Sequence, residues 1–157
     1  MAFSEKQRSE GGREGSPGAF KKTDSPALLK KQASILIVDD IPIVRRMAAR
    51  VAQSAGYTDV TEIDNRDKAL KLIEELTSRG KDKILCISDF DMPNNMDYNS
   101  FREEVLKRNP NVRIILITGT IVEAKDAGAV ADISLAKPFA IEDLKAAIGH
   151  LLDGQGQ

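Results

Sequence analysis

The sequence has one cysteine, one histidine and no tryptophan among its 157 residues. A lone cysteine excludes an intramolecular disulfide and a metal site built from several thiolates. Cys86 lies inside the apolar run ILCIS, which indicates a buried packing residue. His150 lies near the end of a helical pattern, where a histidine is typically solvated. We therefore expect any chemistry to come from carboxylates, hydroxyls and lysines.

Long hydrophobic runs are also absent. No apolar stretch approaches the roughly 20 residues that cross a bilayer. The basic residues Lys6, Arg8 and Arg13 are not followed by the apolar segment of a secretory signal. Hydrophobic residues make up 41% and charged residues 30% of the chain, as in ordinary globular proteins. We therefore expect a cytoplasmic protein with one folded domain and no membrane partner.

The N-terminal segment differs from the rest of the chain in charge and composition. Residues 1–33 hold seven basic and four acidic residues, whereas residues 34–157 hold 16 basic and 20 acidic residues. The segment is rich in Gly and Ser, so we predict a disordered basic tail over 1–33, with at most a short marginal helix at 27–32. The positive surplus is small and spread out, so nucleic-acid binding is not expected. Residues 153–157 are predicted to form a short disordered C-terminal tail.

From residue 34 onward, short apolar runs alternate with segments of helical periodicity. The predicted strands are 35–38, 60–63, 84–88, 113–118 and 131–135. The predicted helices are 42–55, 67–79, 99–108, 122–128 and 141–151. This alternation predicts an α/β fold, a doubly wound sheet of five parallel strands. The run at 60–63 alternates apolar and polar residues, which favours an edge strand.

Polar residues follow the predicted strands where each one ends. Asp39 and Asp40 follow the first strand, Asp89 the third, Thr118 ends the fourth, and Lys137 stands two residues after the fifth. The carboxyl ends of parallel strands form one rim, where such folds bind ligands. Three carboxylates crowded there would repel one another unless a cation lay among them. Oxygen ligands without histidine or thiolate favour Mg²⁺ or Mn²⁺.

The motifs ILIVDD, SDFDMP, ILITG and AKPF occur in the order found in response-regulator receiver domains, and residues 34–152 closely resemble that family. The resemblance implies a flavodoxin-like (β/α)5 fold with strand order 2-1-3-4-5. It also implies a stand-alone, chemotaxis-regulator-like receiver of a two-component phosphorelay. Such a domain catalyses its own phosphorylation and dephosphorylation but is not a conventional enzyme.

Site roles follow from the same resemblance. Asp89 would accept a phosphoryl group from a phosphohistidine, Thr118 would be the switch hydroxyl, and Lys137 would contact the phosphoryl group. The Lys137–Pro138 peptide bond is expected to be cis. The Mg²⁺ ligands would be Asp39, Asp40, Asp89 and the backbone carbonyl of Asp91. The phosphodonor would be a sensor histidine kinase or a histidine phosphotransfer protein, and the phosphorylated state would alter binding to a downstream protein that the sequence does not name.

The chain departs from the family pattern in three features. Receivers usually carry an aromatic residue three positions before the lysine, where this chain has Ser134, and the segment between Thr118 and Lys137 is short, which predicts a reduced fourth helix of the receiver fold. Tyr98 stands where the family usually has glycine, which predicts a different turn, because tyrosine tolerates positive φ poorly.

Two alternative functions stay open at this point. The Asp89-Phe90-Asp91 triplet fits the Asp-x-Asp nucleophile of haloacid-dehalogenase phosphatases, although those enzymes place the nucleophile after the first strand and the acidic pair late. A degenerate receiver that only binds proteins is the second alternative, and Ser134 is its support. Turnover of a phosphomonoester would indicate the first, and failure to accept a phosphoryl group would indicate the second.

Overall fold

Strands and helices alternate through the part of the chain that the computed structural model describes, residues 25–153. In chain order the elements are α1 (Pro26–Gln32), β2 (Ala33–Val38), α2 (Pro42–Ser54), β3 (Asp59–Ile63), α3 (Arg66–Ser78), β4 (Lys83–Asp89), α4 (Tyr98–Arg108), β5 (Arg113–Thr118), α5 (Ile121–Asp126), β6 (Ile133–Ala136) and α6 (Ile141–Leu152).

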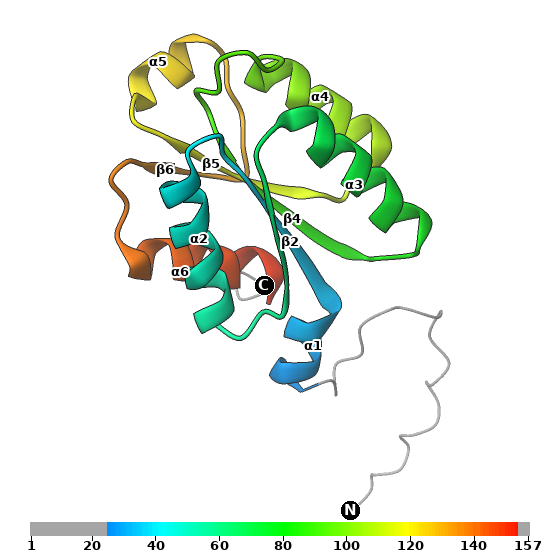
Figure 1. Cartoon of the computed structure of the whole chain (residues 1–157). Coiled ribbons are helices and arrows are strands. Elements are labelled where there is room, and N and C mark those ends of the chain that lie inside the picture. The colour runs from blue at the N-terminus through cyan, green and yellow to red at the C-terminus, as the bar shows by residue number, and fades with distance from the viewer. Residues whose placement is uncertain (1–24, 154–157) are drawn as a thin grey trace, which may run out of the picture.

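The strands form one parallel sheet in the order β3-β2-β4-β5-β6. Counted along the chain, this is the order 2-1-3-4-5, so the doubly wound fold is confirmed. β3, the run with alternating polarity, lies at one edge as predicted. Figure 1 shows α2 and α6 on one face of the sheet and α3 and α4 on the other.

The two faces of the sheet carry separate cores because side chains alternate along a strand. In β2, Ile35 and Ile37 pack with α2 and α6, whereas Leu36 and Val38 pack with α3 and α4. All four side chains are at most 1% exposed. Burying one such side chain stabilises the fold by roughly 1.5–3 kcal/mol, which explains why β2, β4 and β5 are nearly continuous apolar runs.

The boundary of the predicted tail needs correction. Residues 26–32 form α1 and β2 begins at Ala33, which is 1% exposed and pairs with Lys83, so the end of the 1–33 segment is structured. The Lys30 ammonium anchors α1, because its Nζ donates a 2.8 Å hydrogen bond to the carbonyl of Ala55 at the end of α2. Residues 1–24 and 154–157 lie outside the described residues, and the disorder predicted for them remains a prediction.

The loop between β4 and α4 has no positive φ at Tyr98. Tyr98 is the first residue of α4 and is buried, and the positive φ of the loop falls at Asn94, at 68°. Asparagine tolerates this conformation better than most residues. The Tyr98 hydroxyl donates a 2.7 Å hydrogen bond to the carbonyl of Val130, so the substituted side chain has become part of the packing.

The remaining boundaries differ from prediction by one or two residues at most helix and strand ends, and α5 is short, with 6 residues, as expected. Within residues 25–153, no helix combines the length and apolar character needed to traverse a lipid bilayer.

Candidate functional site

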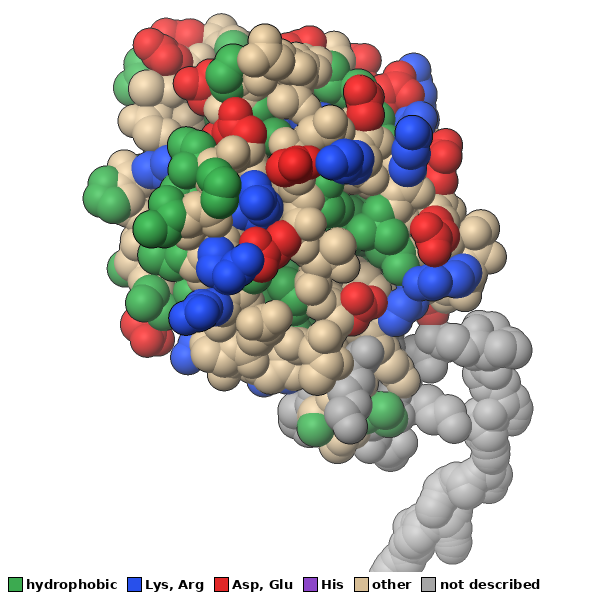
Figure 2. All heavy atoms as spheres, viewed as in Figure 1, with side chains coloured by type: hydrophobic (Ala, Val, Ile, Leu, Met, Phe, Trp, Pro, Cys, Tyr) green, Lys and Arg blue, Asp and Glu red, His purple; other side chains and the backbone are tan. Residues whose placement is uncertain are grey.

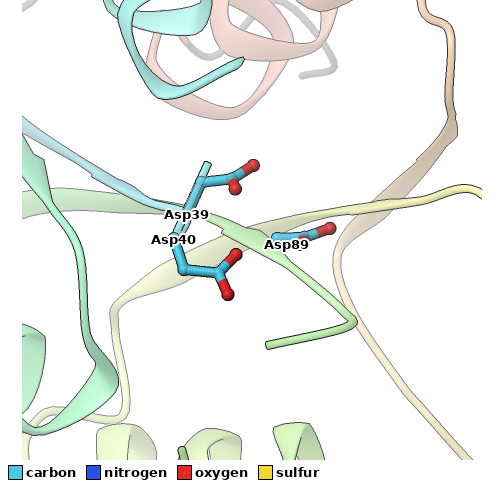
Figure 3. A group of neighbouring side chains, drawn as sticks. All are labelled: Asp39, Asp40 and Asp89. Atoms are coloured by element: carbon cyan, nitrogen blue, oxygen red, sulfur yellow. The ribbon is translucent and has the colours of Figure 1, made fainter. Parts of the chain in front are cut away.

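Three carboxylates meet at the rim formed by the carboxyl ends of the strands. Asp39 and Asp40 directly follow β2, and Asp89 is the last residue of the neighbouring strand β4. One oxygen of each residue lies within 4.8 Å of the others, and Figure 3 shows the three side chains together at the ends of the two strands. Asp39 and Asp89 are buried, and Asp40 is half-buried.

Backbone hydrogen bonds hold Asp39 in place. Its Oδ1 accepts from the amide of Ile41 at 2.9 Å, and its own amide donates to the carbonyl of Ile63 at 3.1 Å. Its carbonyl accepts from the Arg45 guanidinium at 2.8 Å. The first carboxylate of the cluster is therefore fixed from β3 and from the start of α2.

Lys137 supplies a positive charge to the cluster. Its Nζ lies 2.9 Å from Oδ1 of Asp89 and 3.9 Å from Oδ2 of Asp39. Its amide donates to the carbonyl of Thr118 at 2.8 Å, and the following peptide bond to Pro138 is cis, as the resemblance implies. Three carboxylates and one ammonium leave an excess of two negative charges at the rim.

The pKa values of the buried carboxyls reflect this crowding. Burial raises the pKa of Asp89, and the Lys137 ammonium opposes that rise through its hydrogen bond and charge. Burial also raises the pKa of Asp39, while the amide of Ile41 lowers it and the charge of Asp89 raises it further. Repulsion among the carboxylates therefore destabilises the folded protein, and a bound cation would relieve that repulsion.

Thr118 and Asp91 are not members of the three-carboxylate cluster. The buried Thr118 ends β5, and its Oγ1 accepts from the amide of Thr120 at 3.0 Å and lies 3.3 Å from the Thr120 hydroxyl. The Asp91 side chain is exposed. No described group donates a hydrogen bond to the Asp91 carbonyl. Thr120 was not predicted from the sequence as a neighbour of the switch hydroxyl.

Residues 35–149 match the family described as "Response regulator receiver domain". The chain belongs to this family. The receiver domain is 32% identical over 138 residues to the sensor kinase CckA of Brucella abortus, a match that covers 86% of this chain but only 14% of that kinase. It is also 32% identical over 126 residues to a probable chemotaxis protein CheY of Rhizobium etli, which covers 76% of this chain and 92% of that protein.

Solved structures agree with the fold of this receiver domain. The chemotaxis response regulator CheY4 of Vibrio cholerae is 26% identical with a TM-score of 0.61, covering 76% of this chain and 98% of that one. The receiver domain of the hybrid histidine kinase CckA is 26% identical with a TM-score of 0.60, and the match covers 76% of this chain and 99% of that one. The protein is thus a receiver domain of the two-component type, and the family match decides against the haloacid-dehalogenase alternative.

One buried residue of this receiver domain was missed from the sequence. Arg66, the first residue of α3, is 1% exposed and contacts the backbone of Asp89 from inside the fold. A cation at a helix N-terminus is disfavoured by the helix dipole. That mismatch was the one sequence signal that could have drawn attention to it.

Proposed function

We propose that Asp89 accepts a phosphoryl group from a phosphohistidine in a sensor histidine kinase or a histidine phosphotransfer protein. In this reaction an oxygen of Asp89 forms a bond to phosphorus while the bond from phosphorus to the donor imidazole nitrogen breaks. The observation that carries the proposal is the pairing of the Asp89 carboxylate with Lys137 at 2.9 Å, inside a cluster with Asp39 and Asp40. The nucleophile, its counter-charge and the acidic pair are therefore already assembled.

The donor set fits a magnesium ion. The cluster offers carboxylate oxygens alone and carries excess negative charge, which suits a hard divalent cation. Asp39, Asp40 and Asp89 would hold the ion, together with the backbone carbonyl of Asp91. When bound, Mg²⁺ supplies charge neutralisation and orientation of phosphoryl oxygens.

The basic and hydroxyl groups have separate tasks. Lys137 holds the Asp89 carboxylate before transfer, and its compact ammonium pairs with a phosphoryl oxygen afterwards. The Thr118 oxygen accepts a hydrogen bond from the Thr120 amide, and the Thr118 hydroxyl would donate its proton to another phosphoryl oxygen. Movement of Thr118 toward that oxygen would shift the loop that leads into α5, and this shift would alter binding to the downstream protein.

A surface beside the rim supports a protein as the phosphodonor. α2 starts two residues after Asp40, and its outer face exposes Ile43, at 76%, and Met47, at 42%. These side chains line a groove with Arg46, Arg50 and Ile141. Figure 2 shows hydrophobic side chains beside basic ones over this part of the molecule. An apolar helical partner with acidic flanks would match this surface.

Treatment with acetyl phosphate and Mg²⁺, followed by intact mass measurement, tests the proposal. The wild-type protein should gain one phosphoryl group, and Asp89→Asn should gain none. Asp82→Asn is the matched control, because it removes an exposed carboxylate near the opposite end of β4 and should still be labelled. Labelling that survives in Asp89→Asn would place the acceptor elsewhere, and an unlabelled wild-type protein would favour the degenerate receiver.

A further inference from the structure

Arg66 is the largest of the fully buried side chains of the described chain. Its guanidinium donates to the backbone carbonyls of Asp89, of Phe90 at 3.1 Å and of Met96 at 2.7 Å. Its backbone amide donates to Oδ1 of Asn95 at 2.8 Å. One residue of α3 thus holds both ends of the loop that connects Asp89 to α4.

This arrangement is costly for a residue with a purely structural role. Within residues 25–153 no carboxylate forms an ion pair with Arg66, and its Nε has no hydrogen-bond partner. Burial lowers the pKa of the guanidinium. The rings of Tyr98 and Phe101 lie 5.9 and 5.6 Å from it and offset part of the cost. A well-packed apolar side chain usually fills such a place at lower cost, so packing alone does not account for the arginine.

The contacts of Arg66 are directed at the backbone of the phosphoacceptor. The Asp89 side chain faces Lys137 and the acidic pair, while its carbonyl and that of Phe90 are held by the guanidinium. Rotation of either peptide group would break a charge-assisted hydrogen bond in a site closed to water. The carbonyl of Asp91, the next along the chain, is not held in this way.

We infer that Arg66 is a positioning residue for phosphoryl transfer. By holding the carbonyls of Asp89 and Phe90, it fixes the Asp89 carboxylate against Lys137 and leaves the carbonyl of Asp91 as the one available at the rim. The inference rests on the proposed role of Asp89. Misplacement of a reacting group by about 1 Å can slow a reaction by up to about a hundredfold, so a rigid anchor behind the nucleophile affects the rate directly.

Arg66→Gln and Arg66→Lys test this inference without leaving a large void. Glutamine removes the charge and keeps one amide donor group. Lysine keeps the charge but lacks the planar guanidinium whose nitrogens donate to three carbonyls. Leu76→Ala is the matched control, because Leu76 is buried at the other end of α3 and its truncation lowers stability without touching the loop. Phosphorylation by acetyl phosphate is followed by intact mass at saturating Mg²⁺, and urea unfolding gives the folded fraction by which each rate is divided.

We expect both Arg66 variants to be at least about tenfold slower per folded molecule than the wild type, with Leu76→Ala within about twofold. Equal rates per folded molecule in the Arg66 variants and the wild type would overturn the inference alone, since the wild type would still be labelled. Full activity of Arg66→Lys would also overturn it. A positive charge at this position would then be enough for fast phosphorylation, without the guanidinium hydrogen bonds to several carbonyls. An unlabelled wild-type protein would instead overturn the proposed function, and the inference with it.

Discussion

Replacing Asp40 with asparagine should stabilise the protein in the absence of divalent cations. The oxygens of Asp39, Asp40 and Asp89 lie within 4.8 Å of one another, and at that distance two unit charges repel by about 0.9 kcal/mol in water and about 3.5 kcal/mol at an effective dielectric constant of 20. Asp40 takes part in two such pairs and is half-buried, so the lower figure applies to each. We expect Asp40→Asn to raise the free energy of unfolding by about 1–2 kcal/mol.

The effect should depend on pH in a defined direction. Burial and neighbouring charge raise the pKa of Asp39 and of Asp89, and the Asp40 charge contributes to both. A carboxyl whose folded pKa is raised costs stability as the pH rises above its unfolded pKa of about 3.9, because the folded state then gives up a proton that it holds more tightly. The higher free energy of unfolding of Asp40→Asn should therefore be present at neutral pH and should shrink as the pH falls toward the pKa of the carboxyls in the unfolded state.

Urea unfolding at pH 7 in chelator and in Mg²⁺ measures both parts of the prediction. A ligand at a hundred times its dissociation constant stabilises a protein by about 2.7 kcal/mol. Mg²⁺ at such a concentration should stabilise the wild type by this amount and Asp40→Asn by much less. The order of stability should therefore reverse on adding Mg²⁺. Asp82→Asn, an exposed carboxylate near the opposite end of β4, is the control and should follow wild type. A variant no more stable than wild type in chelator, or stabilised equally by Mg²⁺, would refute the argument.

Two further outcomes are expected. Deleting residues 1–24 should leave the midpoint of urea unfolding unchanged. Deleting residues 1–33 should lower that midpoint, because α1 and the first residue of β2 are lost. Equal midpoints for the two deletions would show that α1 adds nothing to stability. Beryllofluoride with Mg²⁺ should shift amide resonances most at 89–98 and 118–124, with little change at the exposed Ser134, whose small side chain can bury little apolar area on switching. Shifts centred on Ser134 and α6 would contradict that expectation.

The layout of the sheet and the acidic cluster could be predicted because both depend on local patterns. β2, β4 and β5 are buried on both faces, so each must be a continuous apolar run, and polar residues can follow only where a run ends. Asp39, Asp40 and Asp89 stand at such ends in neighbouring strands, and parallel pairing then brings them together. The geometry of the rim thus follows from strand polarity and not from details of packing.

The role of Arg66 could not be predicted in the same way. Its partners are carbonyls 23 to 30 residues away, and only the path of the loop after β4 brings them together. α1 raises the same difficulty, because a helix of 7 residues is marginal alone and depends on the contact of Lys30 with Ala55, 25 residues away. Tyr98 was expected to alter the turn, but the hydrogen bond from its hydroxyl goes to the carbonyl of Val130, 32 residues away, which no local pattern predicts.

The two ends of the described chain both contact Tyr57, which bears on how such a domain can be joined to others. Lys30 of α1 lies over the ring of Tyr57, at 5.6 Å, and the Tyr57 hydroxyl donates to Asp153 at 2.8 Å. β2 runs 6 residues, about 20 Å, from this end of the sheet to the acidic rim. Neighbouring entry and exit points, remote from the reactive edge, suit a module for insertion into longer polypeptides. A fusion at either point would leave the reactive edge open to an incoming phosphodonor.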